Sequence, residues 1–451
     1  MATQQQAQAT TDKRPGPAGL GRLTVAGYKS LLKPTSIRIA PLTILAGANS
    51  SGKSSIMQPV LLMKQTLESS FDPGALLLQG PHVQLTSTDQ LFSHCGPSRT
   101  ATSMSVEIET TEGEFVRTAF ERKPSTGLAV TETERKWSDE HYTLRLEMNS
   151  DQVAVAMPNR LQREMSFFRS DIDKSSKWKV ARNRCFLVPA IEFSSESGAS
   201  SFPAPNFQVT ADHLVSSMLH LPGLRGNPAR TYPVTSIDTS FPGPFPPYTA
   251  SIIANWQDRT AGFELYLVNA NLQKLGLTDH VEAKRINDTE VELRVARVLG
   301  KSGNRPGDMV SLADVGLGVS QTLPVIVALC VATPGQTVYI EQPEIHLHPR
   351  AQFTMADVLI DAANRGVRVV VETHSSITLL GIQAAVAEGR ISGQDVALHW
   401  FSRDRFGQTQ VQSVELGESG DFGDWPEDFS DVYLHAQGRY LDAVERRTLA
   451  H

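Results

Sequence analysis

The sequence predicts an α/β fold with a mixed central sheet, an antiparallel β subdomain and an inserted α+β region. Three patterns indicate this architecture. A strand pattern precedes the glycine-rich turn Gly47–Ser54 and a helical pattern follows it, polar and apolar residues alternate over 103–155, and apolar strands alternate with helices from residue 309 onward. Strands that alternate with helices favour a parallel sheet, whereas polar–apolar alternation favours antiparallel strands with one solvated face.

The chain has 451 residues and a formal net charge of −6. This length suits one large domain or about two to three ordinary ones. We divide it into a disordered tail (1–20), an N-terminal lobe with a β subdomain (21–190), an inserted region with a connector (191–308) and a C-terminal lobe (309–451). The negative charge provides no global field for nucleic acid. Three widely spaced cysteines and the lack of a long apolar segment favour a cytoplasmic protein without disulfides or a membrane span.

The elements of the first three hundred residues follow from local patterns. Short strands end in a buried strand before Gly47, and a helix covers 54–70. Antiparallel strands fill 103–155, including the alternating stretch QVAVAM at 152–157. Serine, proline and glycine over 194–247 favour long loops, and 251–277 is helical. Strands return at 281–299, and 300–308 forms a flexible connector.

The C-terminal lobe shows a regular α/β pattern. We expect a helix from about Ser320, a strand at 337–341, a helix from Pro349 to Gly366, a strand at 367–372 and a helix from about Ser376. Proline suits the first turn of a helix and glycine its C-terminal stop. One face of the 349–366 helix carries the apolar residues Ala351, Met355, Val358, Leu359 and Ala362.

The turn GANSSGKS, Gly47–Ser54, fits the pattern G-x-x-x-x-G-K-[ST] between a strand and a helix, which is typical of a phosphate-binding loop. Its glycines allow conformations in which successive N–H groups point at phosphate oxygens. Lys53 would reach the β- and γ-phosphates, and Ser54 would hold Mg²⁺. We expect the loop to bind ATP through Gly47, Asn49, Ser50, Ser51, Gly52, Lys53, Ser54 and Ser55.

Acidic and glycine-rich segments complete the candidate site. A P-loop needs a carboxylate on a neighbouring strand for its magnesium ion, and Glu341 at the end of VYIE supplies one. About thirty residues later His374 ends another buried strand, where it would hydrogen-bond the γ-phosphate or the attacking water. DVGLGVSQ places glycines before a helix start, which exposes further N–H groups.

In this order the segments resemble the ABC-class ATPase heads of the SMC and OLD group. GANSSGKSS is similar to the family form G-x-N-x-S-G-K-[ST], DVGLGVSQ lies where the signature loop belongs, IEQPEIHLHP resembles the strand-plus-LHP element, and ETHS resembles the segment with the switch histidine. The chain is most similar to short prokaryotic members that lack a Toprim nuclease and carry a Trp-Pro tail, here DFGDWPEDFSD. LLLQGPHVQL and LPGLRGNPARTYP also look like the middle region of that subgroup.

The resemblance implies a dimer whose two heads enclose two ATP molecules, each P-loop facing the signature loop of the other copy. Gly316, Gly318 and Ser320 are then the contacts in trans, with Ser54 and Glu341 at the metal. It further implies an ATP-dependent switch that controls a separate effector protein such as a nuclease, with antiphage defence as the suggested setting.

The family strand usually ends in a metal-binding acid followed by a catalytic base, and Gln342 stands in the base position. Three options remain: Gln342 orients the water without deprotonating it, Glu344 supplies the carboxylate, or hydrolysis is very slow. We expect real but slow hydrolysis with Glu344 as base and Gln342 and His374 as the other catalytic candidates.

Other polar segments have a structural and a functional interpretation. The run KSSKWKVARNR, 174–184, gathers basic residues around Trp178 and would bind a nucleic-acid backbone and stack a base, unless it is a solvated strand face. Arg225 and Arg230 would reach ATP or a partner, or be structural. His346 and His348 lack an evident third ligand, so we expect them to shape a loop.

Competing functions follow from the same motifs. The first alternative is a DNA-binding head for repair or chromosome maintenance, against which the missing coiled-coil arms argue. A nucleotide-binding subunit of a transporter and a small-molecule kinase fit less well. The long β-rich insertion is atypical of the former, and the latter would need neither the signature loop nor His374.

Overall fold

A computed structural model describes residues 18–96, 99–123, 127–160, 162–163, 177–195, 198–203, 210–236, 240–259, 262–297 and 308–422, with 438, 439 and 441. Residues 1–17 of the predicted tail (1–20), 300–307 of the connector (300–308) and 423–431 of the Trp-Pro segment (421–431) lie outside these residues. None of the helices within the described ranges is both long and apolar enough to cross a bilayer.

A six-stranded mixed sheet forms the centre of the molecule, in the order β11-β16-β17-β3-β18-β19. The first five strands run parallel and β19 pairs antiparallel with β18. The strands are β11 (Leu219–Leu221), β16 (Thr337–Glu341), β17 (Arg368–Thr373), β3 (Leu42–Gly47), β18 (Val396–Arg403) and β19 (Thr409–Glu415). One strand, β17, therefore separates the strand before the glycine-rich turn from the strand that ends in Glu341.

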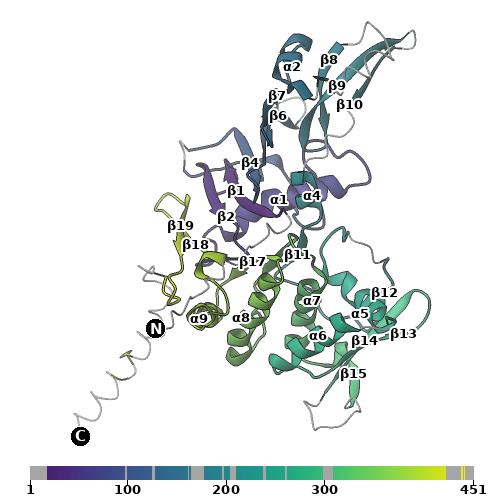
Figure 1. The fold of residues 1–451 in the computed structure, drawn as a ribbon, viewed down its shortest axis with the longest axis vertical. Coiled ribbons are helices and arrows are strands. Elements are labelled where there is room, and N and C mark those ends of the chain that lie inside the picture. The colour runs from purple at the N-terminus through teal and green to yellow at the C-terminus, as the bar shows by residue number, and fades with distance from the viewer. Residues whose placement is uncertain are drawn as a thin grey trace, which may run out of the picture.

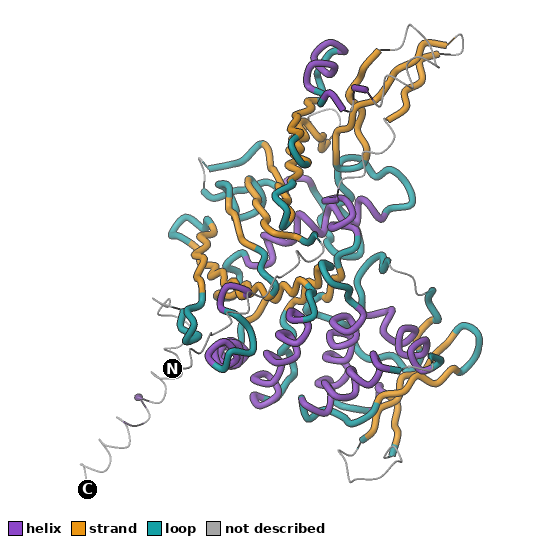
Figure 2. The backbone as a smooth tube through the Cα atoms, viewed as in Figure 1, coloured by secondary structure: helices purple, strands orange, loops and turns teal. Residues whose placement is uncertain are grey.

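Helices cover both faces of this sheet (Figure 1, Figure 2). On one face lie α7 (Leu317–Val331), α8 (Pro349–Asn364) and α9 (Ser376–Ala387), and on the other lies α1 (Lys53–Glu68). Alternate strand residues enter two separate cores: Ile340 and Val371 pack with the α7–α9 side, whereas Tyr339 and Val370 pack with the α1 side. Because side chains alternate along a strand, Glu341 and Glu372 point to the α1 side.

The antiparallel β subdomain packs over α1. Its six strands follow the order β2-β1-β4-β5-β6-β7, which are Thr35–Arg38, Leu20–Ala26, Ser103–Thr110, Phe115–Lys123, Gly127–Trp137 and Glu140–Arg145. A second antiparallel sheet, β10-β9-β8, extends from it at the top of Figure 1 and comprises Gly198–Pro203, Phe186–Ser195 and Lys177–Asn183. Alternating burial along β4 and β5 confirms the expected half-solvated strands.

The prediction of a strand at QVAVAM is wrong, because these residues belong to helix α2 (Ser150–Ala156). Asn149 and Gln152 form a capping box: the Asn149 side chain accepts from the Gln152 N–H and the Gln152 side chain accepts from the Asn149 N–H, each at 2.9 Å. Only Val153 is buried, while Val155 is 85% exposed. The local cap therefore outweighs the alternating pattern.

In the inserted region α4 (Thr210–Ser216) packs against α1, whereas α5 (Thr249–Gln257) and α6 (Phe263–Lys274) pack against α7. A small sheet contains β12 (Tyr232–Pro233), β13 (Val281–Arg285) and β14 (Glu290–Ala296), and β15 (Met309–Ser311), just after the predicted insert, pairs with β14. Single 3-10 turns occur at Thr88–Gln90, Pro246–Tyr248, Leu312–Asp314 and Gly393–Asp395. The C-terminal helices form as predicted, with the five apolar residues of α8 buried, although α7 begins at Leu317 rather than near Ser320.

Candidate nucleotide-binding site

The glycine-rich turn has the backbone of a phosphate-binding loop. Gly47 and Gly52 have φ of 142° and 103°, in the region that favours glycine. A Cβ at Gly47 would approach the Phe401 carbonyl oxygen to 2.2 Å, and one at Gly52 would approach Thr409 Oγ1 to 2.2 Å. Thr409 Oγ1 donates to the Ser51 carbonyl oxygen at 2.8 Å and so supports the loop from β19. Residues 48–50 are exposed at its tip.

Lys53 and Ser54 begin α1 directly behind this loop. The Lys53 side chain folds back over the loop, and its Nζ donates to the carbonyl oxygens of Gly47 and Ala48 at 2.9 and 2.8 Å. Burial lowers the pKa of Lys53, and the nearby charges of Glu372 and Glu344 oppose that shift. A lysine held between loop carbonyls and carboxylates is placed to turn toward a phosphate.

The carboxylate that contacts Ser54 is Glu372, which is not among the residues predicted from the sequence. Ser54 Oγ lies 2.8 Å from Glu372 Oε2 and donates to that carboxylate, and Tyr339 Oη also donates to Oε2, at 3.2 Å. Glu372 stands opposite Glu341 in the β16–β17 ladder. Its position before Thr373 and His374, at a strand end like that of Glu341, is the signal that would have found it.

Glu341 is held by residues around β11. Its Oε2 accepts from the Gly223 N–H at 3.0 Å, and its Oε1 lies 3.3 Å from His220 Nε2. Arg225 Nη2 donates to the Glu341 carbonyl oxygen at 2.7 Å, and Nη1 donates to the Gln321 carbonyl oxygen of α7. Arg225 therefore supports the strand end, which is the structural interpretation left open above. Arg230 also makes a structural contact: its guanidinium donates two hydrogen bonds to the carboxylate of Asp314.

The two neighbouring carboxylates differ in electrostatic environment. Burial raises the pKa of Glu372 and the negative charge of Glu341 adds to the rise, while the hydrogen bond from Ser54 only partly offsets it. Burial alone would raise the pKa of Glu341, but His220, Gly223 and Arg225 outweigh it and the net shift is downward. A buried acid, Glu372, beside a partly buried one, Glu341, favours a bound cation, which would relieve their repulsion.

These oxygens fit Mg²⁺. The ion prefers hard oxygen ligands and is usually held by one or two carboxylates together with substrate phosphates and water. Ser54 and Glu372 offer a hydroxyl and a carboxylate beside the phosphate-binding turn, and Glu341 offers a second carboxylate next to Glu372. Among the described residues no group of three or more His, Cys, Asp and Glu side chains could enclose a metal by itself. The phosphates of a bound nucleotide would therefore supply the remaining oxygen ligands of the ion.

Glu344 and His374 also lie close enough to Lys53 to interact with its charge. Glu344 is 8% exposed, and its Oε1 accepts from Thr373 Oγ1 at 2.7 Å and from the His374 N–H at 2.9 Å. Its Oε2 is buried and has no hydrogen-bond partner within the described part of the chain. Burial lowers the pKa of the His374 side chain and the Lys53 charge adds to this, while contact with the Gly47 backbone opposes it.

Gln342 adopts a left-handed backbone with φ of 47°, and its N–H donates to the Glu372 carbonyl oxygen at 2.7 Å. This conformation turns the chain sharply after β16 and allows Glu344 to approach β17. The P-loop, Glu341, Gln342, Glu344 and His374 are thus brought to one end of the sheet, as the sequence predicts.

Comparison with known families agrees with this arrangement. Residues 192–380 match the family model described as "AAA domain, putative AbiEii toxin, Type IV TA system". The P-loop lies before the matched segment, while Glu341 and His374 lie within it. The central sheet places β3, which precedes the P-loop, next to β17, and β17 next to the acidic strand β16. The chain therefore has the strand order of a P-loop nucleotide-binding fold, and its residues 192–380 are similar to the AAA family named above.

Three solved structures with distant similarity are SMC heads. One is an SMC head bound to the C-winged helix domain of ScpA (12% identity, TM-score 0.48, 89% of this chain and 99% of that one). The others are the SMC head domain from Thermotoga maritima (13%, 0.40, 88% and 100%) and an Smc head with an extended coiled coil bound to the C-terminal domain of ScpA, from Pyrococcus furiosus (11%, 0.45, 95% and 100%). A sequence search of curated proteins finds no match.

The glycine-containing segment that the sequence predicts to be a signature loop precedes α7. Gly316 caps the helix and is exposed, and a Cβ there would meet no atom within 4 Å. Gly318 lies close to the His346 carbonyl oxygen. Ser320 is 6% exposed, and its Oγ donates to the Leu317 carbonyl oxygen at 3.2 Å. Of the three predicted contacts in trans, Gly316 is presented outward, whereas the Ser320 hydroxyl turns into its own helix.

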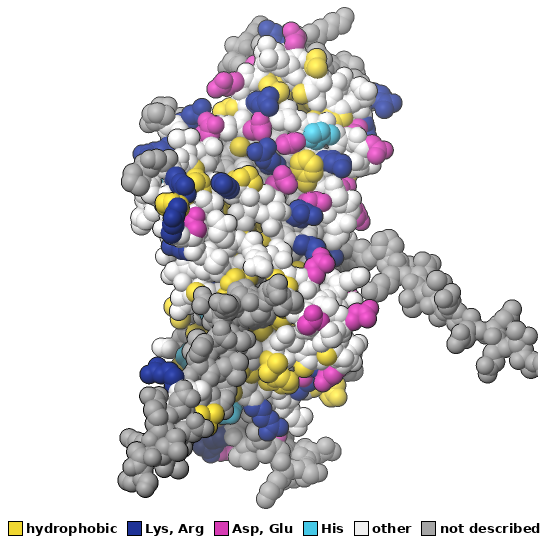
Figure 3. All heavy atoms as spheres, turned by 90° about the vertical axis from the view of Figure 1, so that its left-hand side faces the viewer, with side chains coloured by type: hydrophobic (Ala, Val, Ile, Leu, Met, Phe, Trp, Pro, Cys, Tyr) yellow, Lys and Arg dark blue, Asp and Glu magenta, His cyan; other side chains and the backbone are white. Residues whose placement is uncertain are grey.

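The basic run at 174–184 is described from residue 177 onward. Trp178 is 7% exposed, so its ring is not presented for stacking on a base. Lys179 pairs with Glu192, and Arg182 pairs with Asp72. On the face drawn in Figure 3, basic and acidic side chains are intermixed. These observations favour the solvated strand face over a nucleic-acid site.

His346 and His348 belong to the loop between β16 and α8. His348 caps α8: its Nδ1 accepts from the Arg350 N–H at 3.4 Å. His346 has a left-handed backbone with φ of 66°. Both features agree with the expected loop-shaping role.

Proposed function

We propose that the chain is a magnesium-dependent ATPase that dimerises on binding ATP and acts as a switch for a separate effector protein. The observation that supports it best is the convergence of Lys53 and Ser54 with Glu372, Glu341 and Glu344 at one end of the central sheet. Phosphoryl transfer needs positioning and charge stabilisation more than covalent chemistry, and this set provides both.

In the proposed reaction Lys53 leaves the Gly47 and Ala48 carbonyls and binds the β- and γ-phosphates. Mg²⁺, when bound, neutralises charge that develops on the phosphate oxygens. Glu344 accepts the proton of the attacking water on Oε2, because its Oε1 is already occupied by Thr373 and His374. Gln342 orients the water, and the His374 side chain contacts the γ-phosphate. With a base held so firmly by its neighbours, we expect slow turnover.

Dimerisation would use the start of α7. The exposed N–H groups at Gly316 and the positive end of the helix dipole favour an anion, here the γ-phosphate bound by the other copy. Leu317, at 40% exposure beside it, supplies an apolar contact. ATP then links the two copies, and hydrolysis releases them.

The role as a switch in antiphage defence rests on the sequence resemblance and on the wording of the matched family, which names a toxin–antitoxin system. The effector would be a separate protein such as a nuclease. Identification of a protein that copurifies only with the ATP-bound form would test this part of the proposal.

Replacing Gly316 with glutamate is expected to abolish ATP-dependent dimerisation while the monomer still binds ATP. The new carboxylate has free space within its own chain, so folding is preserved, but it would face the phosphate of the second copy. Analytical ultracentrifugation with ATP and Mg²⁺ measures the effect. Gly316→Ala, which adds no charge, should dimerise like the wild type. A Gly316→Glu variant that dimerises normally would contradict the proposed interface.

A further inference from the structure

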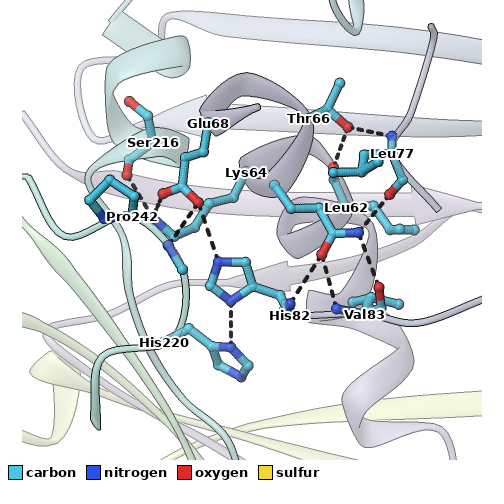
Figure 4. Close-up of polar contacts among 12 residues, drawn as sticks. Leu62, Lys64, Thr66, Glu68, Leu77, His82, Val83, Ser216, His220 and Pro242 are labelled. Atoms are coloured by element: carbon cyan, nitrogen blue, oxygen red, sulfur yellow. Dashed lines mark hydrogen bonds and ion pairs between the residues drawn. The ribbon is translucent and has the colours of Figure 1, made fainter. Parts of the chain in front are cut away.

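Two buried histidines connect the far end of the P-loop helix to Glu341. Figure 4 shows His82, from the loop after α1, facing His220 of β11. Their Nδ1 atoms lie 2.9 Å apart, and His220 Nε2 lies 3.3 Å from Glu341 Oε1. On the other side, His82 Nε2 lies 3.5 Å from Oε2 of Glu68, the last residue of α1. Both histidine side chains are essentially inaccessible to solvent.

The outer end of this chain is fixed by Lys64 and the backbone. Lys64 is fully buried, forms an ion pair with Glu68 and donates to the Ser216 carbonyl oxygen at 2.7 Å. Glu68 Oε2 also accepts from the Gly243 N–H at 3.1 Å. His220 stacks on Tyr339, with ring centroids 5.4 Å apart and planes 10° apart. The same Tyr339 donates to Glu372, so the stack joins both carboxylates of the metal site.

The hydrogen bond between His220 and Glu341 has a defined direction. An ionised Glu341 only accepts, so His220 must donate to it from Nε2–H. The other His220 nitrogen, Nδ1, shares one proton with Nδ1 of His82, 2.9 Å away. At the outer end, His82 Nε2 lies 3.5 Å from Glu68 Oε2, farther than in a well-formed hydrogen bond. The arrangement therefore directs the Nε2–H of His220 at Glu341 Oε1.

We propose that His220 is a positioning residue for the metal-site carboxylate Glu341, and that His82, through its contact with His220 Nδ1, holds the His220 ring in place. This inference rests on the proposed magnesium-dependent ATP binding. Outer hydrogen-bond partners of metal ligands orient them, and their loss typically weakens metal binding by about 10–100-fold. His220 has this relation to Glu341, and neither histidine contacts the phosphate-binding loop in any described hydrogen bond.

The test measures the Mg²⁺ gain, defined as the dissociation constant for ATP in EDTA divided by that in excess Mg²⁺, by isothermal titration calorimetry. His220→Phe keeps an aromatic ring against Tyr339 but removes the N–H donor. We expect its Mg²⁺ gain to fall by about tenfold or more, with the constant in EDTA within about twofold of wild type. His220→Gln, which restores an N–H donor, should recover part of the gain. His82→Phe should also lower the Mg²⁺ gain, but by less than His220→Phe does.

A matched control is His399→Phe. His399 is also 1% exposed and lies in the same sheet, but its ring bonds Ser413 Oγ and the Arg38 carbonyl oxygen, away from the carboxylates. Its Mg²⁺ gain should equal that of the wild type even if its melting temperature falls.

An unchanged Mg²⁺ gain in His220→Phe would overturn the inference. A loss of ATP affinity that is equally large in EDTA and in Mg²⁺ would also overturn it. Should His220→Phe fail to fold, an unchanged gain in His82→Phe would overturn it. If the wild type bound no ATP at all, the proposed function itself would fail, which is a distinct outcome.

Discussion

Replacing Lys53 with alanine is expected to raise the dissociation constant for ATP by on the order of a hundredfold. Hydrogen bonds to charged groups contribute about 1.5–3 kcal/mol each, and Lys53 is the cation that lies against the P-loop carbonyls in a buried position. Loss of its charge also leaves Glu372 and Glu344 without the opposing charge that it provides. Calorimetry or a fluorescent ATP analogue measures the effect.

The control for this experiment is Lys274→Ala. Lys274 of α6 makes ion pairs with Asp357 and Asp361 of α8 and lies away from the P-loop. Lys274→Ala removes one positive charge, as Lys53→Ala does, but leaves the site intact. The affinity for ATP should therefore be unchanged. Equal affinities for Lys53→Ala and Lys274→Ala would exclude Lys53 as a phosphate ligand.

Replacing Glu344 with glutamine is expected to lower the turnover number for ATP hydrolysis by about a hundredfold or more, with ATP affinity changed by less than about threefold. General-base catalysis typically contributes about 10²–10⁴-fold, and a loss in turnover without a loss in binding indicates an interaction of the transition state. The substitution keeps the side-chain shape and its contact with Thr373, so the site should remain folded. Phosphate release under saturating ATP and Mg²⁺ measures the rate.

Gln342→Ala separates the two candidates for water activation. If Glu344 is the base and Gln342 only orients the water, Gln342→Ala should lose less turnover than Glu344→Gln. If hydrolysis is unchanged in Glu344→Gln and turnover falls strongly in Gln342→Ala, Gln342 rather than Glu344 activates the attacking water.

The fold was largely predictable because its strongest elements carry local signals. The central strands are largely apolar since both of their faces are covered, and α8 has both its proline start and its glycine stop. The stretch 152–157 was mispredicted because alternation is a weaker determinant than a capping box when only Val153 is buried. The basic run at 174–184 was ambiguous for a related reason: Trp178 occupies an inward position of β8, which composition alone does not reveal.

The site was predictable where its residues are contiguous. Gly47–Ser54 forms one turn, and its glycines are required by the close approach of Phe401 and Thr409. Glu372 was missed because its role depends on strand register, which sets it opposite Glu341 and against Ser54. His82 and His220 are 138 positions apart in sequence, and no pattern in either segment indicates that they meet.

The central claim is that ATP and its divalent ion bind between the P-loop and the acidic ends of β16 and β17. Calorimetric titration of the wild-type chain with ATP, in Mg²⁺ and again in EDTA, tests it most directly. The account predicts one ATP bound per chain, with higher affinity in Mg²⁺ than in EDTA. Absence of ATP binding in both conditions, or equal affinity in the two, would contradict it.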